Sequence, residues 1–441
     1  MKETAETSIA SKQEIGQLKP FEARKIIEHL RKGSVPVEQV SLFSVGRDKW
    51  LQFIEDDLQN YIAQGGSKVR FINGDYGDGK THFMSIVRHL ALQWGFAVSF
   101  VVLTRDVPIH KFEVVYQTIV QQLTGKFPGT GIRHLLEFWA DQLETELTVE
   151  GDVSLHSRLN VLAEKLRLLP GMNLNFVNGL MAFLAQRYSP LRADETEEDR
   201  QQSLEILYQW FEGGKVAKKD LKPFQIFEAL SKTNSKSFLC SLVTWLKDLG
   251  HKGLILLMDE LETVIAHPTS VRNAAYENVR LLIDNTEQAD SLHIFFSIIP
   301  DVLLAEKGFK SYDALWSRVR SIGDSKRLNY RGVLIDLHRT PLAVKELVEL
   351  GVMLRQIHEL AYRWQAGDMI KDDLIEKLCQ TQQKMGVLNE VRLFIKQVIR
   401  YLDMAEQGEA PEEEGIAEQI TNSQKEMEQE KLEQLQPSWD N

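Results

Sequence analysis

The stretch that decides the fold runs from residue 68 to residue 84 and reads KVRFIN, GDYGDGKT, HFM. Its first part is a mostly apolar segment of strand length, and its middle part matches the pattern G-x-x-x-x-G-K-[ST] in full. Glycines let the backbone of such a loop curl so that its N–H groups face phosphate oxygens, and the lysine adds a positive charge. We therefore predict a phosphate-binding loop at Gly74–Thr81.

The loop also predicts its ligands. Lys80 is expected to reach the β- and γ-phosphates, and the Thr81 hydroxyl is expected to ligate Mg²⁺. The helix that begins near Thr81 points its positive end at the same anion. A glycine-rich turn with a surface lysine is the alternative. The predicted nucleotide-binding residues are Gly74, Asp75, Tyr76, Gly77, Asp78, Gly79, Lys80, Thr81 and His82, and ATP and Mg²⁺ are the predicted ligands.

The segments after the loop predict a parallel sheet. A helix over 81–94 and a strand over 96–103 complete a βαβ unit, which is the unit from which parallel sheets are built. Three later apolar segments have the length and composition of buried strands, namely 253–258, 292–299 and 332–337. The predicted fold is therefore an α/β P-loop NTPase with a parallel five-stranded sheet.

Helical periodicity dominates elsewhere. Between the second and third predicted strands, amphipathic segments such as 112–123, 161–169, 204–211 and 238–249 indicate a large helical insertion. The predicted organisation is a flexible leader at 1–20, a P-loop core at 21–338 with the insertion at about 107–250, a C-terminal helical lid at 339–404, and an acidic tail at 405–441 that is disordered or a solvated helix.

Acidic and hydroxyl side chains follow two of the predicted strands. The strand LILLM delivers Asp259 to its carboxyl end, where it can hold the metal, and Glu260 can polarise the attacking water. A buried strand that ends in an acidic turn is the alternative. Ser297, near the end of the next strand, is expected to contact the γ-phosphate or the water, unless its hydroxyl is satisfied within the sheet.

Several arginines are candidates for the same site. Arg318, before the last strand, is favoured over Arg320 as an arginine finger that reaches a neighbouring subunit. Arg392 opens a late helix and could close over the γ-phosphate. Gly46 and Arg47, in the string VGRD, could line the adenine pocket. A solvated basic turn and a surface arginine are the alternatives for Arg318 and Arg392.

Composition limits the classes of function. The 441 residues carry a formal charge of -11, so nucleic acid can be bound only through a local basic patch or a partner. The two cysteines, Cys240 and Cys379, favour a reducing cytoplasm, and no segment resembles a signal peptide or a membrane span. The clearest basic cluster comprises Lys215, Lys218, Lys219 and Lys222.

Taken in order, these motifs resemble those of an AAA+ ATPase of the origin-recognition type. More closely, residues 21–48 together with FINGDYGDGKTHFM are similar to the ATP-binding proteins of bacterial BREX phage-defence systems, with BrxD nearest in length. The resemblance covers most of residues 20–403. It implies a prokaryotic defence ATPase that acts on phage DNA beside a helicase or nuclease, and a homo-oligomer with nucleotide at the subunit interface.

The chain departs from origin-recognition proteins in two ways. The acidic tail is too short and too polar for the winged-helix DNA-binding domain that usually follows the lid, and the helical insertion has no counterpart in a minimal AAA+ module. A nucleotide-dependent signalling switch that binds protein partners and no nucleic acid is therefore an open alternative. A scaffold that binds nucleotide without turnover is disfavoured by Glu260, and a small-molecule kinase is disfavoured because the sequence shows no acceptor site.

Overall fold

The chain folds into two compact units, as seen in a computed structural model that describes residues 15–148, 153–191, 195–285, 289–320, 327–367, 369–409 and 415–435. The first unit combines residues 1–52, 73–89 and 336–441, and the second combines residues 53–72 and 90–335. This division differs from the predicted one. Residues 73–89, which include the loop at Gly74–Thr81, belong to the same unit as the C-terminal helices. In this unit the N-terminal helix buries its apolar face against the C-terminal helices.

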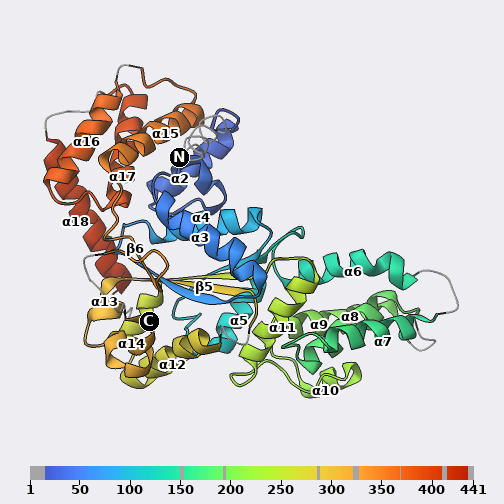
Figure 1. Cartoon of the computed structure of the whole chain (residues 1–441). Coiled ribbons are helices and arrows are strands. Elements are labelled where there is room, and N and C mark those ends of the chain that lie inside the picture. The colour runs from blue at the N-terminus through green and yellow to red at the C-terminus, as the bar shows by residue number, and fades with distance from the viewer. Residues whose placement is uncertain are drawn as a thin grey trace. The chain divides into compact units, whose positions relative to one another are not determined.

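A mostly parallel sheet forms the centre of the second unit (Figure 1). Within the described residues its strands follow the order β3-β2-β4-β5-β1-β6. The predicted α/β class is confirmed, but the predicted number of five strands is wrong. The additional strand, β3, has two residues and pairs antiparallel with β2, so it is too short to leave a pattern in the sequence. The strands are β1 (Lys68–Asn73), β2 (Ala97–Val102), β3 (Leu123–Thr124), β4 (Leu254–Asp259), β5 (Leu292–Ile298) and β6 (Leu334–Asp336).

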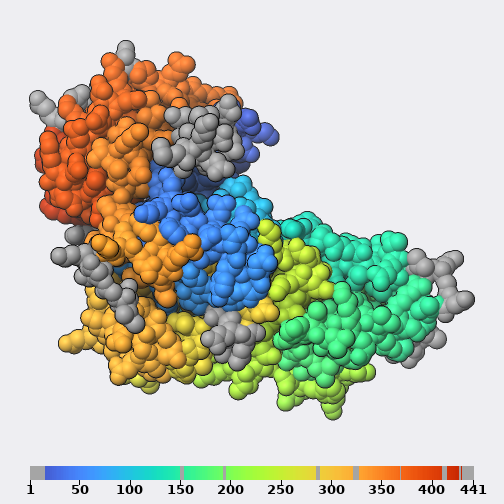
Figure 2. Space-filling model, in the orientation of Figure 1, coloured from blue at the N-terminus to red at the C-terminus, as the bar shows by residue number. Residues whose placement is uncertain are grey.

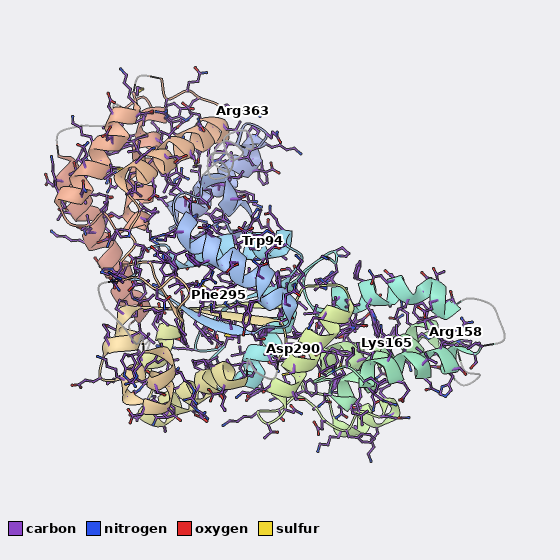
Figure 3. The ribbon with its side chains drawn as sticks, viewed as in Figure 1. Trp94, Arg158, Lys165, Asp290, Phe295 and Arg363 are labelled. Carbon is purple, nitrogen blue, oxygen red and sulfur yellow. The ribbon has the colours of Figure 1, made fainter. Side chains whose placement is uncertain are left out.

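The central strands are continuous apolar runs because both faces of the sheet are covered. Every residue of β4 and of β5 is buried, including Phe295, which Figure 3 labels. The two strands pair in parallel with Met258 opposite Phe296. This register brings the carboxyl ends of β4 and β5 to the same edge of the sheet.

Helices fill the chain between β2 and β4. Of these, α6 to α9 pack side by side, as Figure 1 shows, and Figure 2 shows their surface in green. The core between the helices of this segment is aromatic. The ring centroids of Trp139 in α6 and Trp245 in α11 lie 5.4 Å apart, and the rings are nearly perpendicular. These helices are α5 (Phe112–Gln121), α6 (Ile132–Thr148), α7 (Leu155–Arg167), α8 (Leu174–Tyr188), α9 (Glu197–Phe211), α10 (Lys218–Leu221) and α11 (Ser235–Asp248). After β4 come α12 (Thr269–Asn285), α13 (Pro300–Leu304) and α14 (Asp313–Val319).

The first unit is built around a second hydrophobic core. In it, α2 packs against α15 and α17 through Ala23, Ile26, Ile27 and Leu30. Arg31 fixes this packing, since its guanidinium donates to Asp403 at 2.7 and 3.0 Å and to the Tyr362 hydroxyl at 3.0 Å. The helices are α2 (Pro20–Arg31), α4 (Lys80–Gln93), α15 (Val344–Tyr362), α16 (Asp372–Lys384), α17 (Val391–Glu406) and α18 (Ile416–Leu435), and α3 (Asp48–Asn60) crosses the division between the units.

The tail contradicts the prediction of a disordered segment or a solvated helix. In α18, Ile416 and Ile420 are buried, and the Gln397 amide of α17 donates to the Ser423 hydroxyl at 2.6 Å. The polar composition misled the prediction because a few apolar residues and side-chain amides are sufficient to hold the helix on α17. No helix among the described residues has the length and apolarity to cross a membrane.

Candidate functional site

The loop between β1 and α4 has the backbone that its glycines permit. Gly77 and Gly79 lie at φ 95° and 88°, in the left-handed region that a side chain disfavours. The carbonyl of Gly79 accepts the first hydrogen bond of α4, from Phe83 N at 2.8 Å. Lys80 and Thr81 are therefore in the first turn of the helix, where backbone N–H groups have no partners within the helix and favour an anion.

Lys80 is a buried cation that lies over its own loop. Its Nζ donates to the carbonyl oxygens of Gly74 at 2.9 Å and Asp75 at 3.1 Å, and lies 5.2 Å from the centroid of the Tyr76 ring. The ammonium group is thus held at the concave side of the loop by carbonyl dipoles.

The carboxylate of Asp78 and the ring of His338 also contact the loop. Asp78 is buried and accepts the Asp75 backbone N–H at 2.7 Å, and burial raises the pKa of its carboxyl group. His338 Nδ1 lies 3.0 Å from the Asp75 carboxylate and 3.5 Å from that of Asp78. These three side chains could hold a cation, but we assign none, because acidic groups alone do not define a metal site.

Arg47 reaches the loop from the N-terminal segment. Its guanidinium donates to the Asp78 carbonyl at 3.4 Å, to the Leu337 carbonyl at 3.5 Å and to the Thr340 hydroxyl at 3.3 Å. Burial lowers the pKa of Arg47 to about 10, which leaves it charged at neutral pH. Gly46 precedes it at φ 65°, and a side chain there would meet Leu342. The VGRD string thus binds the loop's backbone through Arg47.

His82 packs against the segment that precedes VGRD. Its Nε2 lies 3.3 Å from the Ser44 hydroxyl, and its ring centroid lies 5.4 Å from that of Phe43. Loss of water around the ring, together with the charge of Arg47, lowers the pKa of His82 to about 4. A neutral ring at physiological pH suits a position beside a buried arginine.

Arg392 lies at the start of α17, next to the same loop. Its backbone N–H donates to the Gly77 carbonyl at 3.4 Å, and its side chain passes over Gly33. The first unit therefore gathers Gly46, Arg47, His82 and Arg392 around the loop. The Cδ and Nε atoms of Arg392 lie 3.5 Å from the position of a Cβ at Gly33.

In the second unit, three predicted residues meet at the carboxyl ends of β4 and β5. The Ser297 hydroxyl donates to the Asp259 carboxylate, and it accepts the Glu260 backbone N–H at 2.8 Å. The same N–H lies 3.0 Å from Asp259 Oδ1. Ser297 is thus engaged within the sheet, which was the alternative to a direct contact with phosphate, and it fixes the positions of both acidic residues.

Glu260 has an uncommon backbone for its residue type. Its φ is 63°, in the left-handed region, and its side chain is exposed at the end of the buried strand β4. A non-glycine residue in this region is strained by about 1 kcal/mol or more and is frequent at functional sites. The turn directs Glu260 away from the buried Asp259, so the two adjacent carboxylates occupy different environments.

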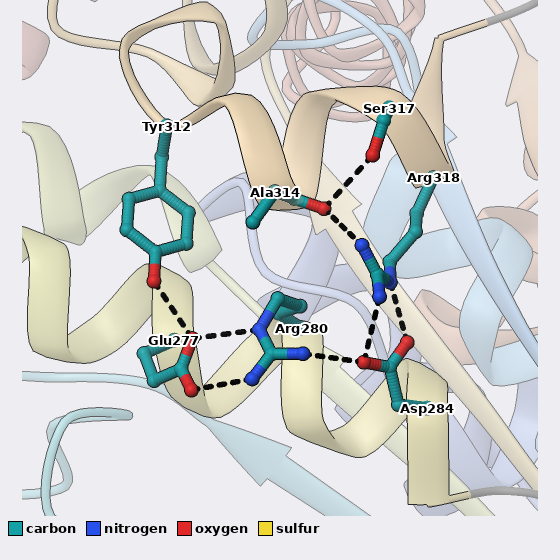
Figure 4. Close-up of polar contacts among 7 residues, drawn as sticks. All are labelled: Glu277, Arg280, Asp284, Tyr312, Ala314, Ser317 and Arg318. Carbon is teal, nitrogen blue, oxygen red and sulfur yellow. Dashed lines mark hydrogen bonds and ion pairs between the residues drawn. The ribbon is translucent and has the colours of Figure 1, made fainter.

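A network of hydrogen bonds and ion pairs holds Arg318, the first candidate for the arginine finger (Figure 4). The Arg318 guanidinium binds both carboxylate oxygens of Asp284, one of them at 2.9 Å, and donates to the Ala314 carbonyl at 2.5 Å. Arg280 joins Asp284 to Glu277, and hydrogen bonds from Arg280 lower the pKa of Glu277 to about 2. Arg320 is exposed at the end of α14, and no ion pair with another described residue holds it.

Sequence reasoning missed the residues that brace the loop from a distance. His338 and Thr340 follow β6 and lie against Asp75 and Arg47, respectively. The only signal was their place directly after a strand, where polar side chains are common for many reasons. The network of Glu277, Arg280 and Tyr312 behind Arg318 left no sequence signal beyond charges one turn apart in α12.

Comparisons with known proteins identify the family of the chain. No curated protein and no solved structure matches the chain significantly. The family model described as BREX system ATP-binding protein BrxC/D matches residues 18–420, which include both groups of residues described above. The match spans more than nine-tenths of the chain's 441 residues. The chain therefore belongs to the BrxC/D family of BREX system ATP-binding proteins.

Proposed function

We propose that this protein binds Mg²⁺-ATP and hydrolyses it, with the loop at Gly74–Thr81 and the acidic residues Asp259 and Glu260 serving the same nucleotide. The observation that carries the proposal is the state of Lys80. Its buried ammonium group donates to two carbonyl oxygens of the loop, and such a donor can exchange these acceptors for phosphate oxygens, which bind it more strongly because they are charged.

In this proposal the other site residues have separate roles in binding phosphate, holding Mg²⁺ and activating water. Backbone N–H groups of the loop and of the first turn of α4 donate to the phosphates. Thr81 and Asp259 offer the hydroxyl and carboxylate oxygens that Mg²⁺ prefers, and the bound ion would neutralise charge on the phosphates. Glu260 accepts a proton from the attacking water or orients it. Ser297 acts through Asp259 and Glu260 and is a positioning residue.

Phosphate release by the full chain tests the proposal. We expect steady release of inorganic phosphate from ATP with Mg²⁺ and loss of release when EDTA removes the metal. A chain that binds a fluorescent ATP analogue but releases no phosphate, alone or with DNA, would instead support the non-hydrolysing scaffold.

We further propose that the protein assembles with copies of itself and that an arginine acts across the subunit interface. Arg318 is the arginine that the sequence favours, but it already binds Asp284 and Ala314. The geometry therefore favours Arg320. Mixing Lys80→Ala chains with Arg320→Ala chains should restore activity that neither variant has. If only the mixture with Arg318→Ala restores activity, Arg318 is the finger.

Membership of a phage-defence family supports action on DNA with helicase or nuclease partners. A signalling switch that binds only proteins is the second candidate, favoured by the net charge of -11. Adding DNA to the phosphate-release assay separates them. Stimulation at low salt supports the DNA-directed function, whereas unchanged activity together with no gel shift supports the switch.

A further inference from the structure

We propose that the faces of α2 and α17 form a binding surface for the backbone of single-stranded nucleic acid. The basic surface consists of Lys25, His29, Lys32, Arg392, Lys396 and Arg400. It lies within the first unit and is separate from the lysine cluster that stood out in the sequence. The proposal extends the DNA-directed part of the proposed function and rests on it.

Tertiary packing brings basic side chains of α2 and α17 together in one surface. Lys32 follows the last residue of α2 as its C-cap, and Gly33 comes next. The side chains of Arg392 and Lys396 pass over Gly33, and their nearest atoms lie 3.5 and 3.4 Å from the position that a Cβ would have there. Arg400 continues the row along α17. Residues four apart lie on the same side of a helix, one turn or about 6 Å along its axis. The row of three therefore covers about 12 Å.

Two carboxylates near the surface, those of Glu28 and Asp403, pair with residues that are not part of it. Glu28 pairs with Arg31 at 2.7 Å, and Asp403 pairs with Arg31 and with His358. Among the described residues, no ion pair holds Lys25, Lys32 or Arg400. In a chain with a net charge of -11, such a row is where a polyanion can approach without repulsion.

An exposed aromatic residue favours nucleic acid over an acidic protein. Phe21 is 72% exposed, and the Lys25 ammonium group lies 5.9 Å from the centroid of its ring. A hollow of about 340 Å³ is lined by this side of α2, from Phe21 to Ser34. An aromatic ring beside a row of cations is the combination that binds single strands, because bases stack on the ring while phosphates meet the cations.

The surface begins at the phosphate-binding loop. Arg392, the first residue of the row on α17, donates its backbone N–H to Gly77. Binding of a strand along α17 can therefore change the energy of the loop, and the reverse must hold to the same extent.

Fluorescence anisotropy with a fluorescein-labelled oligo(dT) of 20 nucleotides tests the proposal on the full chain without nucleotide. We expect binding at low salt that weakens steeply as salt rises. The variant Lys32→Glu, Lys396→Glu, Arg400→Glu should bind at least about tenfold more weakly and with a shallower salt dependence. The matched control is Lys218→Glu, Lys219→Glu, Lys222→Glu, which changes the net charge equally and should bind like the wild type.

A further variant separates stacking from charge. Phe21→Ala should weaken binding about fivefold or more while leaving the salt dependence unchanged. Circular dichroism and thermal melting establish that each variant is folded.

Three outcomes would overturn the proposal. These are no binding by the wild type at low salt, an equal loss in the control variant, and competition by polyglutamate as effective as by unlabelled oligo(dT), which would indicate an acidic protein partner. ATP binding is measured separately with a fluorescent analogue. A chain that binds ATP and no oligonucleotide contradicts this proposal alone, whereas one that binds the oligonucleotide without hydrolysing ATP contradicts the proposed function alone.

Discussion

The phosphate-binding loop in the first unit and the acidic strand ends in the second are built differently. The loop is held by residues far away in the chain, among them Arg47, His338 and Arg392. The Ser297 hydroxyl on the neighbouring strand contacts both residues of the acidic pair. The loop carries the Lys80 ammonium group and two aspartates, whereas the strand ends carry only carboxylates. Binding and chemistry are thus assigned to regions that single substitutions can separate.

The largest effect is expected from Glu260→Gln. Removal of the carboxylate charge should lower the rate of phosphate release by roughly 100-fold or more, as for loss of a general base. The affinity for a fluorescent ATP analogue should stay unchanged, because the loop is intact. A parallel loss of affinity would show that the two regions are not separable in this way.

Lys80→Ala makes the opposite change, in the loop. Loss of a charge-assisted contact of about 1.5–3 kcal/mol should weaken nucleotide binding about 10- to 100-fold. Titration with the fluorescent ATP analogue measures this. Retained affinity with a lost rate would place Lys80 in the chemistry and not in binding, and would contradict the division between the regions.

Ser297→Ala tests how firmly the acidic pair must be held. Two hydrogen bonds of about 1 kcal/mol each are lost, so we expect phosphate release to fall about tenfold at unchanged nucleotide affinity. Ser99→Ala is the matched control, since this buried serine of β2 donates only to the Ile119 carbonyl. Equal effects of the two substitutions would mean that stability alone is responsible.

The smallest expected effect is a dependence on pH in both regions. The pKa of His82 is lowered to about 4, and burial holds the pKa of His293 in β5 well below its usual value. Because the folded state favours the neutral rings, their contribution to stability is complete above pH 6.5 and is lost as the pH falls toward 4. Melting temperatures between pH 7.5 and pH 5 should fall less steeply for His82→Gln and for His293→Gln. Slopes equal to that of the wild type would contradict this assignment.

The strands and the main helices could be predicted because their signals are local. The apolar runs at residues 254–259 and 292–298 are long enough to identify buried strands without other information. By contrast, β3 has two residues and exists only because β2 presents a free edge to it. The helix α18 was misjudged because its few buried residues, Ile416 and Ile420, are separated by polar ones.

The sequence by itself determined the glycine-rich loop between β1 and α4, because the positive φ of Gly77 and Gly79 and the helix start at Lys80 depend on adjacent residues. Only the tertiary structure decided which distant side chains meet. Packing of α2 on α17 placed Gly33 beside Lys396, and pairing of β4 with β5 placed Ser297 on Asp259. Such contacts join residues 38 to several hundred positions apart, and a linear pattern carries no information about distances of that kind.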